Sequence, residues 1–329
     1  MISVVVPVRN DPGRLAKCLS SLARSTYPPL EIIVVDDAST DTTARVAEAS
    51  GATVIRMEQR CGPGVARNHG AAVARGEILV FVDADVCVHT DTLARFSAAF
   101  EDIPRPDAVF GAYDTTPSEP GRVSQFKNLS HHFVHQRNRG AASTFWAGCG
   151  AIRREVFLKA GGFDRAFDRP SIEDIELGLR LHTRGHLILL RPEIQATHLK
   201  RWTLRGVIAS DTLDRAAPWT ELLLAHGPLP STLNLAMDQR VSAALTWVAC
   251  ALVPASLFLG PWALAVAALL AALVVALNWR FHAFFMEQRG PLFLLVSVPL
   301  HLIYFVCCGV GAGLGTVRHM MRHRIPEAV

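Results

Sequence analysis

Acidic side chains follow a short apolar run early in the sequence. Asp83 and Asp85 come directly after Ile78–Val82 and are separated by a single alanine. Two carboxylates at this spacing can jointly hold a divalent cation and contact a ribose or a phosphate. Mg²⁺ or Mn²⁺ is the expected ion, because hard cations take carboxylate, water and phosphate oxygens. Such an ion neutralises charge on a leaving diphosphate. An ordinary turn is the alternative explanation of this Asp-x-Asp motif taken alone.

A second acidic pair, Asp36 and Asp37, follows the apolar run Glu31–Val35. A carboxylate at this place can accept hydrogen bonds from a base or a ribose. The alternative is that one member of the pair caps the following turn, before Asp41 begins a helix. We assign the turn to Asp36 and the ligand to Asp37.

The first third of the chain predicts the scaffold that would bring these acids together. Short runs rich in valine and isoleucine alternate with helix-length segments, as in a Rossmann-like α/β sheet. Ligands bind such sheets at the carboxyl ends of the strands, where both acidic pairs stand. The predicted strands are Ile2–Pro7, Glu31–Val35, Thr53–Arg56 and Ile78–Val82, and the predicted helices are Gly13–Ser25, Thr40–Ser50 and Gly64–Arg75.

Residues 107–200 mix strands and helices less regularly and contain a candidate acceptor site. Phe145 to Gly150 combine aromatic residues with glycines, which suits a sugar that stacks on a ring beside closely approaching backbone. A buried strand with a tight turn explains Phe145 equally well. Trp146, with Gly148 beside it, is therefore the functional candidate.

Four motifs occur in order along the first hundred residues: Pro7-Val8-Arg9-Asn10, Val34-Val35-Asp36-Asp37-Ala38-Ser39-Thr40-Asp41, Ala66-Arg67-Asn68-His69-Gly70 and Asp83-Ala84-Asp85. Together they resemble family 2 glycosyltransferases with the GT-A fold, and the match continues with looser spacing to about residue 202. The resemblance implies inverting transfer of a sugar from a nucleotide-sugar, often a UDP-sugar or GDP-mannose. It also implies that Asp85 binds the metal and that the nucleotide is contacted by Pro7, Arg9, Asp37, Arg67 and Asp83.

A further acidic pair, Glu173 and Asp174, opens a predicted helix that ends at His182. Acidic residues at a helix N-terminus are often only caps. In the family, however, a Glu-Asp pair at this point typically contains the catalytic base. Inversion needs a carboxylate that takes the acceptor proton as the hydroxyl attacks the anomeric carbon. The resemblance therefore assigns the base to Asp174, with Glu173 as support on the acceptor side.

The segment from His198 to Trp202 resembles the Gln-x-x-Arg-Trp motif of family members that extend polysaccharides, with histidine in place of glutamine. This departure argues against processive synthesis. In other members a late histidine completes the metal shell, which makes His198 the second metal candidate. Arg201 could brace the diphosphate. Trp202 could stack on the acceptor sugar or insert at the membrane interface.

The composition narrows the classes of protein. The seven cysteines contain no Cys-x-x-Cys spacing, which favours a reduced, cytosolic setting over a zinc site or a disulfide framework. The net charge of +4 does not point to nucleic acid. Met1 leads straight into a predicted strand, so we expect no signal peptide. His131 and His135 have the spacing of metal ligands on a helix, but without an acidic partner nearby a structural or acceptor-contact role is favoured.

The last ninety residues are strongly apolar and predict membrane spans. No charged residue occurs over the 39 positions from 241 to 279. As one helix this run would be about 58 Å long, roughly twice the hydrocarbon thickness, so the Gly260-Pro261 pair predicts a turn between two spans. A second uncharged run, residues 290–317, fits one span or a broken, partly re-entrant one. Residues 280–289 between the runs look interfacial.

The predicted organisation has three parts. Residues 1–202 form the GT-A nucleotide-sugar-binding domain, residues 203–235, with Pro228 and Pro230, form an amphipathic interfacial bridge, and residues 236–329 form an all-α transmembrane region. The predicted spans are residues 241–259, 261–279 and 291–316. Three full crossings from a cytosolic catalytic domain would place Arg318, Arg322 and Arg324 outside, against the positive-inside tendency. A re-entrant hairpin near Pro299 and His301 would keep the C-terminal end inside.

The sequence thus predicts an enzyme of the cytoplasmic (inner) membrane, with its catalytic domain facing the cytosol. It would transfer a sugar from a UDP- or GDP-linked donor to a lipid-linked or other membrane-associated glycan acceptor. Asp174, as a base, favours a hydroxyl over a phosphate acceptor. A polyprenyl-phosphate glycosyltransferase and a polysaccharide synthase are the enzymatic alternatives, and a catalytically idle membrane scaffold is the non-enzymatic one. A nucleotidyltransferase would need a Gly-rich basic loop after the first strand, which Pro7–Asp11 does not provide.

Overall fold

The computed structural model describes residues 1–226 and 237–324 of the chain. These residues divide into two compact units. The sheet unit contains residues 1–119 and 134–200, and the helical unit contains residues 120–133 together with the described residues from 201 onward. The division falls close to the predicted boundary at residue 202, but it also assigns the short segment 120–133 to the helical unit.

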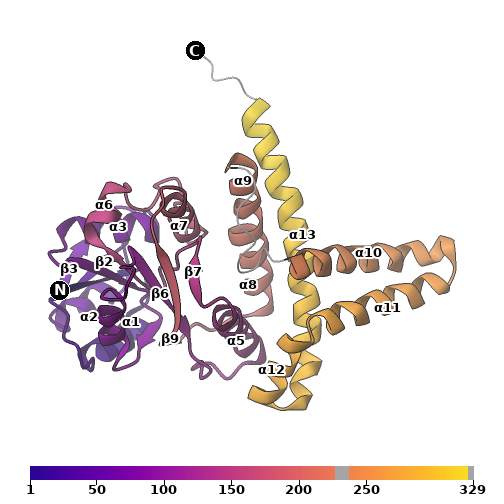
Figure 1. The fold of residues 1–329 in the computed structure, drawn as a ribbon, viewed down its shortest axis with the longest axis horizontal. Coiled ribbons are helices and arrows are strands. Elements are labelled where there is room, and N and C mark those ends of the chain that lie inside the picture. The colour runs from indigo at the N-terminus through magenta and orange to yellow at the C-terminus, as the bar shows by residue number, and fades with distance from the viewer. Residues whose placement is uncertain (227–236, 325–329) are drawn as a thin grey trace. The chain divides into compact units, whose positions relative to one another are not determined.

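The sheet unit is built on one nine-stranded mixed sheet, with strand order β3-β2-β1-β4-β8-β6-β9-β5 and β7 pairing with β9 (Figure 1). The first four strands are parallel, as predicted, while β8 runs antiparallel to both β4 and β6. The strands are β1 Ile2–Val8, β2 Glu31–Asp36, β3 Thr53–Arg56, β4 Ile78–Val82, β5 Val86–Val88, β6 Ala108–Tyr113, β7 Gly140–Ala142, β8 Cys149–Arg153 and β9 Ile188–His198.

The helices of the sheet unit begin where the sequence supplies start signals. The side chain of Asp11 accepts a hydrogen bond from the Arg14 backbone N–H at the start of α1, and proline occupies the first turn of both α1 and α3. The three predicted early helices and the predicted helix at Asp174 are confirmed to within three residues at each end. The helices are α1 Pro12–Ala23, α2 Thr43–Ala49, α3 Pro63–Val73, α4 Thr92–Ala99, α6 Arg154–Lys159 and α7 Glu173–Thr183.

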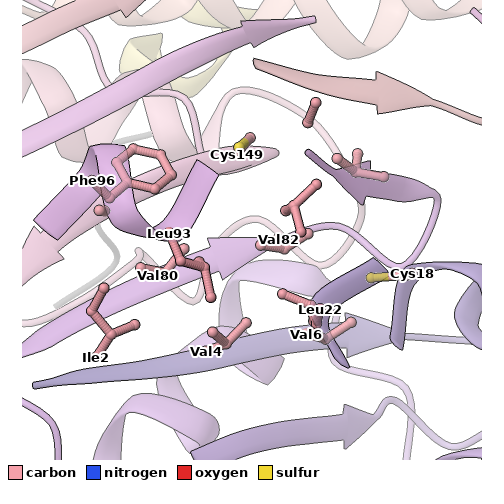
Figure 2. Close-up of a cluster of buried hydrophobic side chains, with 14 of the residues drawn as sticks. Ile2, Val4, Val6, Cys18, Leu22, Val80, Val82, Leu93, Phe96 and Cys149 are labelled. Atoms are coloured by element: carbon pink, nitrogen blue, oxygen red, sulfur yellow. The ribbon is translucent and has the colours of Figure 1, made fainter. Parts of the chain in front are cut away.

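The core lies on both faces of the sheet. On one face, alternate residues of β1 and β4 pack against α1 and α4, and Cys149 of β8 joins them (Figure 2). On the other face, Gly70 of α3 lies against Val5, and Phe81 of β4 packs on Phe157 of α6 with ring centroids 5.2 Å apart. Strands buried on both sides explain the nearly continuous valine and isoleucine runs. They also expose only the strand ends to a ligand.

The helical unit contains helices joined by tight turns. Gly260, with φ of 90°, separates α10 from α11, which confirms the predicted turn. The elements are α5 Arg122–Arg137, whose last four residues belong to the sheet unit, α8 Leu204–Ala209, the π-helix η1 Ser210–Ala216, α9 Ala217–His226, α10 Met237–Leu259, α11 Trp262–Leu277, α12 Trp279–Arg289, the 3₁₀ turn η3 Pro291–Phe293 and α13 Leu294–Arg324.

Two expectations for the apolar region are corrected. The hairpin near Pro299 and His301 is wrong, because α13 continues through both residues as one helix. One proline removes a single backbone hydrogen bond, which the packing of a long helix can offset. The span expected over residues 261–279 is also too simple, since α11 ends at Leu277 and α12 turns away from it by 70°. In the described residues, two helices are long and apolar enough to cross a membrane, or three if the bent pair counts as one.

The expected bridge at 203–235 is helical as far as His226, where α9 ends. Leu204 and Ile208 of α8 are exposed and one turn apart, consistent with an amphipathic segment. Residues 227–235, which include Pro228 and Pro230, lie outside the described residues. The interfacial placement of this bridge stays a prediction.

Candidate active site

The turn after β4 is held by hydrogen bonds to two other segments of the chain, one just before β8 and one just after β9. The Asp83 N–H donates to the Gly148 carbonyl at 3.2 Å, and the Asp85 carbonyl accepts from the Leu199 N–H at 2.8 Å. These bonds link the Asp-x-Asp motif to the predicted acceptor loop and to the segment that follows β9. Three motifs that are far apart in the sequence therefore meet at one edge of the sheet.

Asp85 and His198, the two predicted metal ligands, lie side by side. Oδ2 of Asp85 is 3.6 Å from Nε2 of His198 and 3.7 Å from a terminal nitrogen of Arg14. Burial alone would raise the pKa of Asp85, but the neighbouring His198, together with Lys200 and Arg14, holds that pKa at about 2. Asp85 is therefore ionised at any physiological pH, as a metal ligand must be.

The donor set fits a hard divalent cation that also binds phosphate. In the part of the chain that the structure describes, no group of three or more His, Cys, Asp and Glu side chains could hold a metal. Mg²⁺ and similar ions usually take one or two protein carboxylates and complete their shell with water and substrate phosphates. One carboxylate and one imidazole suit this arrangement, whereas a structural zinc site would need four protein ligands.

Arg67 of α3 contacts the Asp-x-Asp motif from the protein interior. Its buried guanidinium donates to Asp83 Oδ1 at 2.5 Å and to Glu173 Oε1 at 3.0 Å. Burial would lower the pKa of Arg67, but these two carboxylates and Asp174 raise it above its ordinary value. For Asp83 burial dominates and raises the pKa. Arg67 thus connects the strand end that would meet the donor with the start of α7.

This geometry bears on two of the expected roles. Arg67 was expected to touch the nucleotide and Glu173 to support the acceptor, yet both side chains are directed to each other and are less than 10% exposed. The structure gives them a bracing contact, and their direct ligand contacts stay predictions. Asp83, with 34% of its side chain exposed, is the accessible member of the group.

The two acids at the end of β2, Asp36 and Asp37, have different hydrogen-bond partners. Asp36 Oδ1 accepts from the Ser39 N–H at 3.0 Å, as expected of a turn cap. The Asp37 carboxylate accepts from the Cys61 N–H at 2.7 Å and from the Gly62 N–H at 3.0 Å. Asp37 therefore orders the loop before α3, and its remaining lone pairs are what a base or ribose would meet.

The end of β1 carries the two remaining nucleotide candidates. Pro7 is buried within the strand, and Arg9 is exposed just beyond it. Asn10, with φ of 49°, turns the chain and accepts a hydrogen bond from the Thr40 N–H at 2.8 Å. This bond ties the β1 loop to the β2 loop, so that Arg9 stands at the same sheet edge as Asp37. The nucleotide contacts of Pro7 and Arg9 stay predictions.

Asp174, the predicted base, lies at the start of α7. Its Oδ2 accepts from the Ala147 N–H at 3.1 Å, and its Oδ1 accepts from the Ile175 N–H at 2.8 Å. The carboxylate lies beside the positive end of the helix dipole. The carboxylate is half-buried and touches the loop that contains Trp146, so the predicted base and the predicted acceptor loop are adjacent.

Trp146 is held in place by aromatic neighbours. Its ring meets Tyr113 edge to face at a centroid distance of 4.8 Å and meets His135 at 5.3 Å. The indole also lies over Gly148, where an added Cβ would come within 2.7 Å of the ring. Gly148 thus leaves room for the tryptophan. His135 Nδ1 lies 2.9 Å from the Gly111 carbonyl, which supports the structural role expected of this histidine.

Tyr113 and Arg14 were missed by the sequence analysis. Tyr113, the last residue of β6, stacks on the His198 imidazole with centroids 4.3 Å apart and planes 6° from parallel. It therefore touches both the metal candidate and Trp146. Had β6 been predicted, Tyr113 would have been a candidate, because it stands at the carboxyl end of a strand, where ligands bind such sheets. Arg14 gave no comparable signal beyond its place one turn into the helix after β1.

Arg201 and Trp202 belong to the helical unit. The Trp202 N–H donates to Ser124 Oγ at 2.8 Å, and the Lys127 ammonium lies 5.9 Å from the indole centroid. Arg201 is exposed. The diphosphate and acceptor contacts expected of these two residues stay predictions.

Parallel strands that end in an Asp-x-Asp motif, joined to an antiparallel half with a carboxylate at a helix start, are the arrangement of a GT-A glycosyltransferase that uses a nucleotide-sugar. The comparisons with known proteins agree. Residues 3–161 match the family model described as glycosyl transferase family 2. Residues 3–161 therefore form a family 2 glycosyltransferase domain.

Two relatives illustrate the range of the family. An uncharacterized glycosyltransferase of Haemophilus influenzae is 28% identical over 226 residues, which cover 64% of this chain and 72% of the relative. The validoxylamine A glucosyltransferase of Streptomyces hygroscopicus subsp. limoneus is 28% identical over 56% of this chain, and the match spans about half of that relative, 48%.

Solved structures share the fold at low identity. The mannosyltransferase PcManGT from Pyrobaculum calidifontis, in complex with GDP-Man and Mn²⁺, aligns with a TM-score of 0.59 and 20% identity over 94% of this chain and 86% of its own. Staphylococcus aureus TarS 1-349, in complex with UDP-GlcNAc, aligns with a TM-score of 0.51 and 18% identity over 97% of this chain and 92% of its own. These likenesses confirm the predicted GT-A fold.

Proposed function

We propose that this glycosyltransferase is attached to the cytosolic face of the cytoplasmic membrane and transfers a sugar, with inversion, from a UDP- or GDP-linked donor to a hydroxyl of a lipid-linked or membrane-associated acceptor. The observation that carries the proposal is the separation of two acidic sites at one sheet edge. Asp85 is paired with His198, while Asp174 is paired with the loop of Trp146. The first suits a diphosphate and the second an acceptor.

The donor side would work as follows. Asp37 and the loop it orders would receive the base, and Asp83, braced by Arg67, would receive the ribose. Asp85 and His198 would hold Mg²⁺ or Mn²⁺, which when bound supplies charge neutralisation for the departing nucleoside diphosphate. The neighbouring cation Arg14 adds positive charge at the same place.

On the acceptor side, Trp146 would stack on a sugar ring of the acceptor. Asp174 would take the proton of the attacking hydroxyl as its oxygen bonds to the anomeric carbon and the bond to the diphosphate breaks. Both of its oxygens already accept backbone N–H bonds, which fix the carboxylate in place beside the loop of Trp146.

The membrane part of the proposal is supported by the apolar helices of the helical unit. Only 11% of the apolar stretch of α10 is buried, and Leu257 and Phe258 at its end are 84% and 90% exposed. Surfaces of this kind are stable in hydrocarbon and not in water.

The test is a binding and hydrolysis screen of nucleotide-sugars on the full chain in detergent, with Mg²⁺, with Mn²⁺ and with chelator. Metal-dependent binding of one donor, with slow release of its nucleotide, is the expected result. Asp85→Ala should lower the affinity for that donor by about 100-fold in metal and leave the weak affinity in chelator unchanged. Asp91→Ala, a change in an exposed acid of the next helix cap, is the matched control. Folded protein that binds no donor would refute the proposal.

A further inference from the structure

Helix α13 has two unlike faces near both of its ends. One face is exposed and apolar. It is formed by two groups of residues spaced three or four positions apart: Leu292, in the preceding turn, with Leu295 near the start, and Val310, Leu314, Val317 and Met321 near the end. This spacing matches one side of an α-helix. Leu292 and Leu295 are 79% and 77% exposed, so the stripe faces away from the protein.

The opposite face of α13 is packed at its N-terminal end against α12. Phe281 of α12 lies 4.3 Å from the ring of His301, and Phe285 stacks on Phe293, just before the helix, at 5.5 Å. Helix α12 in turn packs on α5, since Phe126 stacks on Phe285 at 5.4 Å. At the last residue of α12, Arg289 Nε donates to Gln125 Oε1 of α5 at 2.7 Å. The beginning of α13 is therefore tied to α5.

The C-terminal half of the same face is packed on η1 and α9. Cβ atoms added to Gly311 and Gly315 would lie 2.4 Å from the Ala216 side chain and 2.3 Å from the Ala217 carbonyl, so the helices touch closely there. One turn further on, Arg318 and Arg322 both reach Glu221 of α9, at 3.7 and 3.0 Å. The end of α13 is therefore tied to α9.

Both α5 and α9 must lie on the catalytic side of the membrane. In the described chain, no candidate span lies between β6 and α5 or between β9 and the end of α9. Helix α5 has the polar sequence RVSQFKNLSHHFVHQR and lies in the chain between β6 and β7, two strands of one sheet, so it begins and ends on the catalytic side. If α13 crossed the bilayer, one of its ends would leave this side and lie about 30 Å away. The contacts with Gln125 and Glu221 hold both ends on one side.

We infer that α13 does not cross the membrane but lies in the plane of the catalytic-side leaflet, with its stripe of exposed apolar residues against the acyl chains. The occupant of this face is lipid, because α13 packs directly on α10, whose exposed apolar surface we place in the membrane. Trp247 of α10 covers Gly309 midway along α13. The hairpin of α10 and α11 is then the membrane-inserted element, and Arg318 and Arg322 lie on the catalytic side, in agreement with the positive-inside tendency. This inference rests on the proposed membrane attachment and not on the transfer reaction.

The depth of α13 tests the inference. In the full chain in lipid vesicles, an azide-bearing amino acid replaces Leu295, Val310 or Val317 and receives a fluorophore, which leaves the native cysteines unchanged. Quenching by lipids labelled at the headgroup or deep in the acyl chain then reports depth. An in-plane helix predicts equal depth at the three sites, about 5–10 Å below the headgroups. A crossing helix predicts that Val310 lies about 10 Å deeper than Val317, seven residues away, and that result would overturn the inference.

Two controls calibrate this measurement. Leu269 in α11, 68% exposed, should be deeper than any position in α13. Arg45 in the sheet unit, which is exposed, should not be quenched by either lipid. Three positions on α13 that are no more quenched than Arg45, in protein that stays with the vesicles, would show that a protein partner and not lipid covers the stripe, which also overturns the inference.

Sidedness gives a second test. Azides at Glu287, before α13, and at the exposed Met320, near its end, should react with a membrane-impermeant alkyne from the same side as Arg45 in sealed inverted vesicles. Reaction of Glu287 and Met320 from opposite sides would refute the in-plane placement. A chain that leaves the membrane fraction on carbonate washing would instead refute the proposed attachment, so the two failures are distinguishable.

Discussion

The sheet unit and the helical unit bury polar groups in contrasting ways. In the sheet unit, ionised groups converge on one place, where Arg67 joins Asp83 and Glu173. In the helical unit, neutral groups join helices in pairs: Asn278 donates to Ser242 Oγ at 2.8 Å and accepts from Gln239 Nε2 at 3.0 Å. Buried charge is costly unless it is paired. In the sheet unit two acids share one buried cation, whereas the helical unit pairs its buried ions one to one, as Lys127 does with Asp211, and joins its apolar helices through neutral groups.

The strongest test of this contrast is the carboxylate placed as the base. Asp174→Asn keeps the shape and the bond from Ala147 but cannot take a proton, so transfer should fall about 10²–10⁴-fold while donor affinity is unchanged. Glu176→Gln, the same change of carboxylate to amide two residues along α7 in a residue paired with Arg180 at 2.7 Å, is the control. Full turnover of the Asp174→Asn variant would remove the base, and would favour a phosphate acceptor, which needs none.

Removing the central cation of the sheet unit should have the next largest effect. Arg67→Met leaves Asp83 and Glu173 without their buried partner and should lower the free energy of unfolding by about 3–5 kcal/mol. Urea unfolding followed by the fluorescence of the full chain in detergent measures the change. The control is Arg56→Met, which breaks an exposed pair with Glu48 and should cost less than about 1 kcal/mol. Equal losses in the two variants would contradict the distinction between a convergent and an isolated pair.

The corresponding change in the helical unit should be smaller. Asn278→Leu removes the hydrogen bonds to Ser242 and Gln239 at the break between α11 and α12. Interhelical bonds of this type contribute about 0.6–2 kcal/mol. Unfolding of the variant in mixed lipid–detergent micelles, with the exposed Ser256→Ala as control, gives the value. A loss as large as that of Arg67→Met would erase the proposed difference between the units.

The smallest expected effect is a pH dependence in the sheet unit. The hydrogen bond with Asp114, at 3.0 Å, raises the pKa of His89 above 6.5. The protonated form is thus favoured by folding, so this stabilisation is fully present below pH 6.5 and is lost as pH rises through the raised pKa. Because His89 is 38% exposed, the effect should be well below 1 kcal/mol. Urea midpoints at pH 6 and pH 9 should differ more in the wild type than in His89→Gln; identical differences would exclude His89.

The sequence allowed prediction of the parallel half of the fold because local signals there agree. Strands β1 to β4 are apolar runs bounded by polar residues, and Asp83 and Asp37 stand at their carboxyl ends. The strands of the antiparallel half, such as β6 and β8, were not predicted, because their pairing partners are distant in sequence. Tyr113 went unnoticed for that reason. The bracing of Arg67 by Glu173, 106 positions away, has no sequence signal at all.

In the apolar helical region, the positions of helices could be predicted but their packing could not. Hydropathy located α10 and the Gly260 turn correctly, because apolar length and a glycine are local features. It could not reveal that α12 turns from α11 or that α13 is packed along one face, since both depend on Phe126 of α5 and Glu221 of α9. An uncharged run shows that a helix is apolar enough for lipid. It does not show whether the helix crosses the bilayer or lies in its plane.

The contact between Trp146 and Gly148 has an evolutionary consequence. The ring occupies the space that a single methyl group on residue 148 would require. A mutation to alanine there would displace the indole, and with it the surface on which an acceptor sugar would rest. Related enzymes could therefore diverge in acceptor preference through one codon at this position, without any change in the carboxylates or in the donor half.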